Sequence, residues 1–531
     1  MSAPAAPAAP ARPYVATLGV FLGAGIVSLG QRLLSAGLPD LRGALGYGFD
    51  EAAWIPTAYN TALMFMGPFS VYLGALLGRR KVLLAAGTIF TLVSIALPFS
   101  PNLTTMLALQ TIAGLASGTF YPLALSFALQ SLPLKYVIYG IGAYSMELLS
   151  SLSLGTPLQA WFVEHWSWHW IFWTSAVLVP IMMLCIYLAM PGPPPSQGPR
   201  PAASWRGFLL ISLGISSIYA ALEQGERLNW LDSGTIVALL VVGALLLLAG
   251  AVHRWRSPNP FVNLGFLAKR NTLILGTGLF SLRFVLLAIL VLVPGYLGAV
   301  QGFRPLQTGA VLLYLAPPVL LFGFLAARLM RRVENRLVAA LGFAVIAVAC
   351  IMDAHLTSDW ARGEFFGPQL VIAAGLATAF VGEIGLIAQQ GLDSGALAKP
   401  VNALTYGAFF QGIRIFGGQL GVAIIQHFIV VRSRFHAAML GAGVQAGHFV
   451  TEDHLRALSG GLAPGTPGTD EVQARVIATV GRQVSRQVLT LSYLDGFLLI
   501  ACACAGMMLL YACVKPMRMY FAARPAAQPS S

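Results

Sequence analysis

Long apolar runs separated by short polar turns fill the chain from about residue 14 to residue 513. A helix that crosses a bilayer needs about 20 mainly apolar residues, because each residue advances the helix by about 1.5 Å. This rule predicts fourteen transmembrane helices. Their ranges are 14–38, 53–74, 82–99, 104–130, 136–162, 168–190, 205–223, 234–253, 271–296, 307–329, 336–353, 364–388, 400–431 and 488–513.

The basic residues divide unequally between the two sides of such a membrane protein. If the N-terminus is cytoplasmic, nineteen Lys and Arg residues lie at inner helix ends and in inner loops, whereas the short outer loops hold only Arg42, Arg227, Arg304 and Arg362. Cytoplasmic loops are enriched in Lys and Arg, so the pattern predicts both termini in the cytoplasm. One helix missed or added would scramble this asymmetry.

Two polar segments divide the predicted helices into groups of six, two and six. Residues 191–204 form a Pro-rich cytoplasmic linker, and residues 436–486 form an outside loop long enough for a small hairpin, with a disordered loop as the alternative. The fold class is therefore an all-α polytopic membrane protein. Its predicted parts are a disordered tail (1–13), a six-helix bundle (14–190), the linker, two additional helices (205–253), a second six-helix bundle (254–514) and a cytoplasmic tail (515–531).

Composition agrees with a multi-pass membrane protein. Of 531 residues, 57% are hydrophobic and 10% charged, against about a quarter charged in soluble proteins. The net charge of +13 does not indicate nucleic-acid binding, because the basic residues form short clusters between apolar runs.

Neither an enzyme nor a metal or cofactor site is predicted. Cys502 and Cys504 are two residues apart and thus on different faces of a helix, where small apolar packing explains them. His165 and His169 lie at a membrane boundary, where a solvated pair is the commoner outcome. No Gly-x-x-x-x-Gly-Lys loop is present, which excludes that motif as a route to ATP binding.

Five charged residues lie well inside the predicted spans. They are Arg32, Glu147, Arg283, Glu383 and Arg414. Each central charge costs about 2.5–3.5 kcal/mol on membrane-insertion scales, so these residues must face one another or a wet cavity. One interpretation is structural: Glu147 would pair with Arg32, and Glu383 with Arg414.

The other interpretation is functional and uses protonation. Low dielectric drives a carboxyl group toward its neutral form, and a nearby Arg draws it back toward the charged form. A group balanced in this way can take up a proton on one side of the membrane and release it on the other. Glu147 is the first candidate for proton coupling and Glu383 the second. Three arginines against two glutamates also favour an amphipathic or aromatic anion as substrate.

Pairs of glycines four residues apart occur in two of the predicted helices. They are Gly114 with Gly118 and Gly417 with Gly421. Small residues at this spacing allow the backbones of two membrane helices to approach closely, so these pairs predict helix contacts.

Several motifs along the chain resemble the fourteen-helix drug:proton antiporter branch of the major facilitator superfamily, the EmrB/QacA type. In order they are DEAAWIPTAYNTA, GRRK, GLASGTFYPLA, SWHWIFW, GFRPLQTGAVLLYLAP, RIFGGQLGVAII and QVLTLSYLDGF. The resemblance spans nearly the whole chain. It implies the major facilitator fold and proton-coupled export of small molecules or drugs by alternating access.

The resemblance also suggests where the site lies. A central cavity would be lined by the first, fifth and corresponding second-half helices. The candidate cavity residues are Arg32, Gln110, Tyr121, Tyr144, Arg283 and Arg414. Gly78, Arg79 and Arg80 would form a cytoplasmic gating loop, with topology alone as the alternative explanation. Residues 436–486 would dock a periplasmic adaptor protein, which would connect to an outer-membrane channel.

Three positions depart from the family pattern. The Asp of the first helix is replaced by Gly30, the Arg of the fourth helix by Gln110, and the Asp of the loop after the second helix by Ala75. Two of these positions are associated with proton coupling in the family. An uncoupled facilitator, an importer and a sensor or scaffold without transport are therefore the alternatives.

Overall fold

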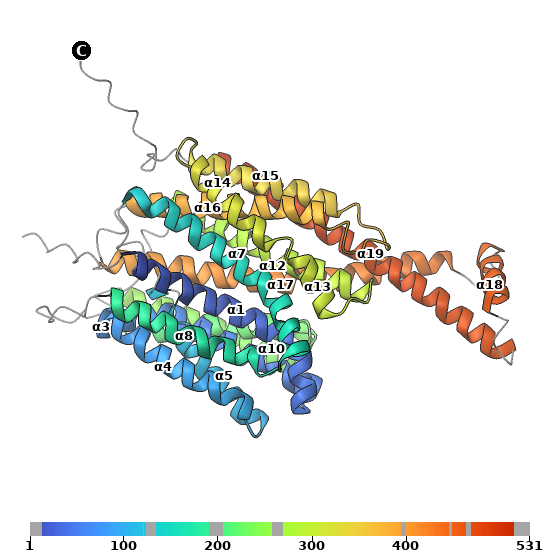
Figure 1. Ribbon diagram of the computed structural model, residues 1–531, viewed down its shortest axis with the longest axis horizontal. Helices are drawn as coiled ribbons and strands as arrows, with labels where there is room; N and C mark the ends of the chain where they lie inside the picture. The colour runs from blue at the N-terminus through green and yellow to red at the C-terminus, as the bar shows by residue number, and fades with distance from the viewer. Residues whose placement is uncertain are drawn as a thin grey trace, which may run out of the picture.

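The computed structural model describes residues 13–120, 122–123, 134–190, 205–256, 269–393, 400–444, 449–462 and 469–514. Regular structure over these residues is entirely helical, which confirms the predicted class. The helices run roughly alongside one another (Figure 1). In the first half they are α1 (Pro13–Leu45), α2 (Phe49–Ala52), α3 (Trp54–Leu77), α4 (Arg79–Ala96), α5 (Leu103–Ser117), α7 (Leu134–His165) and α8 (Trp170–Ala189).

Two further helices precede the second half. They are α9 (Trp205–Gln224) and α10 (Gly234–Arg256). The second half contains α12 (Arg270–Ala299), α13 (Pro305–Leu312), α14 (Ala316–Leu329), α15 (Asn335–Asp353), α16 (Phe366–Asp393), α17 (Pro400–Gly443), α18 (Phe449–Leu462) and α19 (Thr469–Ala512). Single 3₁₀ turns occur at Leu97–Phe99 and Trp230–Asp232.

Eleven helices in the described part of the chain are long and apolar enough to cross a membrane. Each of the fourteen predicted ranges overlaps a helix, although residue 121 and residues 124–130 of the fourth range lie outside the described residues. The range 307–329 is interrupted between Leu312 and Ala316. Pro317 and Pro318 follow at once, and neither has the N–H that a continuous helix would need there. The predicted tails and linker, residues 1–12, 191–204 and 515–531, are not described.

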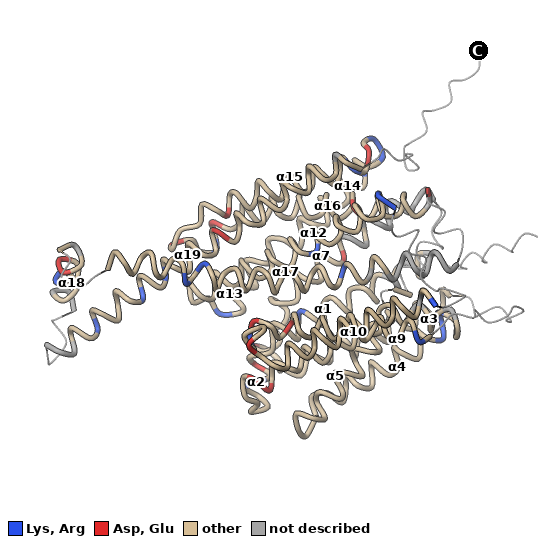
Figure 2. Tube along the Cα trace, turned by 180° about the vertical axis from the view of Figure 1, so that it is seen from behind, with Lys and Arg blue, Asp and Glu red and all other residues tan. Residues whose placement is uncertain are grey.

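Charged residues gather at the ends of the helices (Figure 2). Lys and Arg lie where α3 meets α4 and where α14 meets α15, at the same end of the molecule. The sequence assigned both junctions to one side of the membrane. Acidic residues near α2 lie toward the opposite end.

The interior consists of two large apolar clusters, one for each half. Side chains from a few helices pack into the cluster of the opposite half. Leu148, Leu149 and Leu152 of α7 pack into the second-half cluster. Tyr219 of α9 and Ile415 of α17 belong to the first-half cluster. The halves are therefore joined through side chains of α7, α9 and α17.

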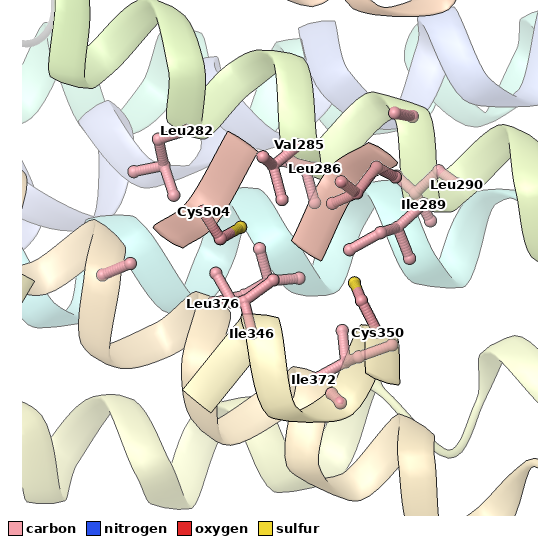
Figure 3. Packing of buried hydrophobic residues seen from close by; sticks show 14 of the residues in the cluster. Leu282, Val285, Leu286, Ile289, Leu290, Ile346, Cys350, Ile372, Leu376 and Cys504 are labelled. Atoms are coloured by element: carbon pink, nitrogen blue, oxygen red, sulfur yellow. The ribbon is translucent and has the colours of Figure 1, made fainter. Parts of the chain in front are cut away.

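Two cysteines lie at the centre of the second-half cluster. Cys350 and Cys504 are buried among the leucines and isoleucines of α12, α15 and α16 (Figure 3). Cys502 is exposed, as the spacing of two residues on a helix requires. The prediction of apolar packing is confirmed for Cys504, whereas Cys502 is not buried.

The polar stretch 436–486, predicted as an outside loop, is mostly helical where it is described. α17 and α19 each have 44 residues, and together with α18 they extend well beyond the other helices (Figure 1). An ionic contact joins α17 to α19 near the start of this extension. Asp495 accepts hydrogen bonds from Arg432 Nε at 2.6 Å and from His436 Nε2 at 2.7 Å. The predicted adaptor-docking region corresponds to this extension.

The paired glycines lie at close helix contacts, as predicted. A Cβ on Gly118 would lie 2.8 Å from the carbonyl oxygen of Leu63, and one on Gly114 would overlap that of Tyr59, so α5 packs directly on the backbone of α3. A Cβ on Gly417 would lie 2.9 Å from the carbonyl oxygen of Phe280 in α12. No shift of a side chain alone can relieve such contacts.

We expect Gly417→Ala to destabilise the protein by about 1–3 kcal/mol, because the methyl group would push α17 away from α12. Thermal unfolding of the purified protein in detergent measures this loss as a lower Tm. Gly412→Ala is the matched control on the same helix, since a Cβ there meets nothing within 4 Å. Equal Tm values for the two variants would contradict the close contact.

Candidate functional site: a polar cluster between the two halves

Buried and half-buried polar residues from six helices meet where the two halves join. We call this group the central polar cluster. Its members are Gln31 and Arg32 of α1, Asn60 of α3, Glu147 of α7, Tyr219 and Glu223 of α9, and Arg283, Arg414 and Gln419 of α12 and α17. Polar groups buried in an apolar interior are stable only when they are hydrogen-bonded or paired, which explains why they collect in one place.

Glu147 lies on α7 against α1. A Cβ on Gly25 of α1 would overlap the Glu147 carboxylate, so the acid occupies space that the glycine leaves free. Ser151 Oγ donates a hydrogen bond to Glu147 Oε1 at 2.7 Å. The other oxygen, Oε2, is buried and accepts no hydrogen bond from the described side chains. Arg414 of α17 is close enough to act on this carboxylate electrostatically.

Arg32 connects the first half to the second, but it does so without Glu147. Its Nε donates to Thr156 Oγ1 of α7 at 3.1 Å, and its Nη2 donates to the carbonyl oxygen of Leu290 in α12 at 3.2 Å. Among the described side chains, Arg32 and Glu147 form no ion pair. The structural pairing considered from the sequence is therefore wrong for these two residues.

A proline explains why the Leu290 carbonyl is available. Pro294 lies four residues later within α12. A proline has no N–H and cannot donate to the carbonyl of residue i−4. In α12 that carbonyl belongs to Leu290, so Arg32 supplies the hydrogen bond that Pro294 cannot. The contact joins the halves at a point where a buried acceptor would otherwise lack a partner.

Arg283 and Arg414 lie side by side across the contact between α12 and α17. Arg283 Nε donates to the backbone carbonyl of Arg414 at 3.3 Å, and both residues are buried. Tyr219 of α9 lies within electrostatic range of Arg283, and its hydroxyl donates to Gln419 Oε1 at 3.3 Å. The structure thus brings these two predicted cavity residues to the cluster.

Glu223 was missed by the sequence analysis. Asn60 Nδ2 donates to Glu223 Oε1 at 2.8 Å, and Gln31 Nε2 donates to Asn60 Oδ1 at 2.9 Å, so one chain of hydrogen bonds links α1, α3 and α9. The predicted span ended at residue 223, and an acid at a span end is expected to reach water. Asp353 was missed for the same reason, and it is fully buried at the end of α15.

The residues after Glu223 connect the end of α9 to both halves through hydrogen bonds and ion pairs. Gln224 Nε2 donates to the carbonyl oxygen of Ala53 at 2.9 Å, and Arg227 forms an ion pair with Asp50 at 2.5 Å. Toward the second half, Glu226 Oε2 lies 2.9 Å from His427 Nδ1 of α17. The helix α9 is therefore part of the junction between the halves.

Glu383 lies apart from the central polar cluster. It is fully buried inside the second bundle, where the Tyr511 hydroxyl of α19 donates to Oε2. A Cβ on Gly278 of α12 would lie 3.0 Å from both carboxylate oxygens. Among the described side chains Glu383 forms no ion pair with Arg414, so the second structural pairing is also wrong.

The remaining predicted site residues are not brought to the cluster. Gln110 is buried in α5, one turn before the contact of Gly114 with α3. Tyr121 lies outside the described residues, and so does the side chain of Tyr144 in α7. Gly78 separates α3 from α4 with φ of 88°, a conformation that favours glycine. Arg80 contacts α8 there through the Tyr187 carbonyl.

The bundle of membrane-length helices, with arginines and acids buried between two halves, is typical of a membrane carrier. Residues 20–426 match the family described as Major Facilitator Superfamily. The chain belongs to the major facilitator superfamily and is a multi-pass protein of the inner membrane. Within it, the chain resembles the EmrB-type multidrug branch, as the sequence motifs indicated.

Three relatives illustrate this resemblance. The chain is 25% identical over 435 residues to the probable multidrug resistance protein EmrY of Escherichia coli (strain K12), covering 81% of this chain and 82% of that protein. It is 24% identical over 439 residues to the multidrug export protein EmrB of the same strain, covering 81% and 83%. It is 23% identical over 430 residues to the fatty acid resistance protein FarB of Neisseria gonorrhoeae, covering 79% and 81%.

Solved structures confirm the fold. The proton:xylose symporter XylE aligns with a TM-score of 0.58 over 95% of this chain and 96% of its own, at 10% identity. A bacterial homologue of the human peptide transporters PepT1 and PepT2 aligns with a TM-score of 0.53 over 94% and 98%, at 17% identity.

We expect Arg32→Met to lower the Tm, because the buried Leu290 carbonyl would lose its donor at a cost of about 1–3 kcal/mol. The loss should be smaller in a Pro294→Ala background, where the new N–H of residue 294 can bond to Leu290 within the helix. A double-mutant cycle on Tm of the purified protein measures the coupling. Strictly additive losses would show that Arg32 does not compensate for Pro294.

We expect Tyr511→Phe to destabilise the second bundle by about 1–3 kcal/mol, since Glu383 would lose its hydrogen-bond donor in a fully buried site. Denaturation of the purified protein in detergent provides the measurement. Tyr14→Phe serves as the control, because Tyr14 is 74% exposed. If both variants unfold alike, the Tyr511 hydroxyl contributes nothing to the bundle.

Proposed function

We propose that this protein is a secondary active transporter that exports amphipathic or aromatic small molecules, including anionic ones, by proton antiport. The observation that carries the proposal is Glu147. It is the acid on α7 between the halves, one of its oxygens is buried without a hydrogen bond, and Arg414 acts on it from the opposite half. Its surroundings would change when the halves rock apart, and proton binding can follow such a change.

The charge balance supports an anionic substrate. Three arginines of the central polar cluster, Arg32, Arg283 and Arg414, stand against two acids, Glu147 and Glu223. When both acids are ionised the cluster is net positive. An anionic amphiphile would balance it, and one relative is named for fatty acid resistance while two are named for multidrug resistance or export.

We further propose fourteen membrane spans arranged six, two and six, with both termini in the cytoplasm. The helices found on all fourteen predicted ranges support the count. The nineteen inner basic residues against four in the short outer loops support the orientation. In this arrangement α9 and α10 are the additional pair.

An uncoupled facilitator is the second candidate. Gly30 and Gln110 replace the acid and the arginine that the family pattern has in the first and fourth helices. In addition, Glu383 is enclosed in the second bundle rather than in the central polar cluster. Proton coupling, if the protein has it, would therefore depend on the two acids of the central polar cluster, Glu147 and Glu223.

The test is proton flux in proteoliposomes that hold an imposed pH gradient. We expect an amphipathic aromatic sulfonate, an anion that stays charged and cannot carry protons through the bilayer by itself, to dissipate the gradient with the wild type and not with Glu147→Gln, because an amide cannot carry the proton. Glu164→Gln is the control, an exposed acid on the same helix α7. Glu223→Gln and Glu383→Gln show whether another acid contributes.

Three other results of these transport assays would each contradict one part of the proposal. Wild-type proton flux in Glu147→Gln would remove Glu147 as the coupling group. Substrate that equilibrates without moving protons would establish the facilitator instead. A substrate panel in which only cations move would overturn the anionic class.

A further inference from the structure

A long apolar groove runs between α4 and α8 on the outside of the first bundle. Its volume is about 510 Å³, and its walls include Leu84, Thr88 and Leu92 of α4 and Pro180, Leu184 and Tyr187 of α8. Leu92, Leu184 and Tyr187 are 62%, 57% and 59% exposed. In a membrane these side chains face lipid, so the groove opens to the bilayer rather than to the central polar cluster.

The two threonine hydroxyls that line the groove already have hydrogen-bond partners within the protein. The hydroxyl of Thr88 donates to the carbonyl of Leu84 at 3.0 Å, and that of Thr91 donates to the carbonyl of Gly87 at 2.9 Å. Both threonines are therefore satisfied within their own helix. Beneath them the two helices are in close contact, since a Cβ on Gly87 would lie 2.7 Å from Met183 Cγ. Such a channel suits a hydrocarbon chain.

Cationic groups stand at one end of this groove. Arg80 precedes Leu84 by four residues, so it lies on the same face of α4. Its Nη2 donates to the carbonyl oxygen of Tyr187 at 3.0 Å, and its guanidinium carbon is 4.7 Å from the centroid of the Tyr187 ring. Lys81 beside it is exposed. Among the described residues, neither cation forms an ion pair.

We propose that this groove binds an anionic glycerophospholipid, with one acyl chain along α4 and α8 and its phosphate at Arg80 and Lys81. The arrangement matches such a lipid in both parts, because an apolar channel open to the bilayer ends in cations at the level of the headgroups. Basic pockets between membrane helices are known to select anionic headgroups. The bound lipid bridges the α3–α4 turn and the end of α8.

The inference does not rest on the proposed function. It concerns the outer surface of the first bundle, and none of its residues belongs to the central polar cluster. Loss of lipid binding with intact proton flux in Leu184→Trp, whose residue lies in the groove and outside the predicted gating loop, would separate this inference from the proposed function.

Native mass spectrometry of the full chain in detergent provides the test, with palmitoyl-oleoyl phosphatidylglycerol and phosphatidylcholine as probes. Their acyl chains are identical, so a difference between them reports on the headgroup. We expect preferential retention of phosphatidylglycerol, reduced roughly tenfold in the Arg80→Gln/Lys81→Gln double variant. Arg206→Gln is the matched control, a basic residue exposed on α9.

A second variant tests the channel itself. Leu184→Trp places a large ring in the groove and should lower retention of phosphatidylglycerol. Leu245→Trp, on the exposed face of α10 where Leu245 is 60% exposed, should not. Tm values near wild type for all variants would show that they are folded.

Several results would overturn the proposal. Equal retention of the two phospholipids would exclude headgroup selection. Wild-type retention in the double variant or in Leu184→Trp would exclude the cations or the groove. If oleate displaced phosphatidylglycerol completely, the occupant would be a single-chain anion and the phospholipid assignment would be wrong.

Discussion

The absence of water in the bilayer core is the constraint on which this structure depends. A buried charge or carbonyl in such a medium must find its partners within the protein. The chain carries several such groups in its spans, and their partners lie mainly on helices distant in sequence. Arg32 shows the consequence most directly: it reaches from α1 to α7 and to the carbonyl that Pro294 frees in α12. Satisfying the arginine thus joins the two halves.

The same constraint applies to α9, which lies between the two halves in sequence. It contacts both of them through polar groups at and just after its end. Arg227 pairs with Asp50 of the first half, and Glu226 pairs with His427 of the second. Glu223 then lies within the hydrogen-bond chain that includes Asn60. Any movement of the halves must change or carry these contacts, so α9 is positioned to take part in it.

The two acids identified from the sequence have similar local sequences but very different surroundings in the structure. Both Glu147 and Glu383 are acids within long apolar helices, and nothing in their local sequence separates them. In the structure, Glu147 lies at the junction near Arg414, whereas Glu383 is enclosed with Tyr511 inside one bundle. Only the former has surroundings contributed by both halves, which is why it is preferred as the coupling group.

The sequence by itself determined the helical class, the positions of the helices and the close contacts at Gly114 and Gly417, because helix length and small-residue spacing are local properties. It also identified the charges that need partners. It did not determine the partners, and it overlooked Glu223 because an acid at a predicted span end looks solvated. Tertiary structure alone decided that Arg32 bonds to Leu290 rather than Glu147, since hydrogen-bond geometry depends on how distant helices pack. The physical reason is that hydropathy is summed along the chain, whereas charge pairing is settled in three dimensions.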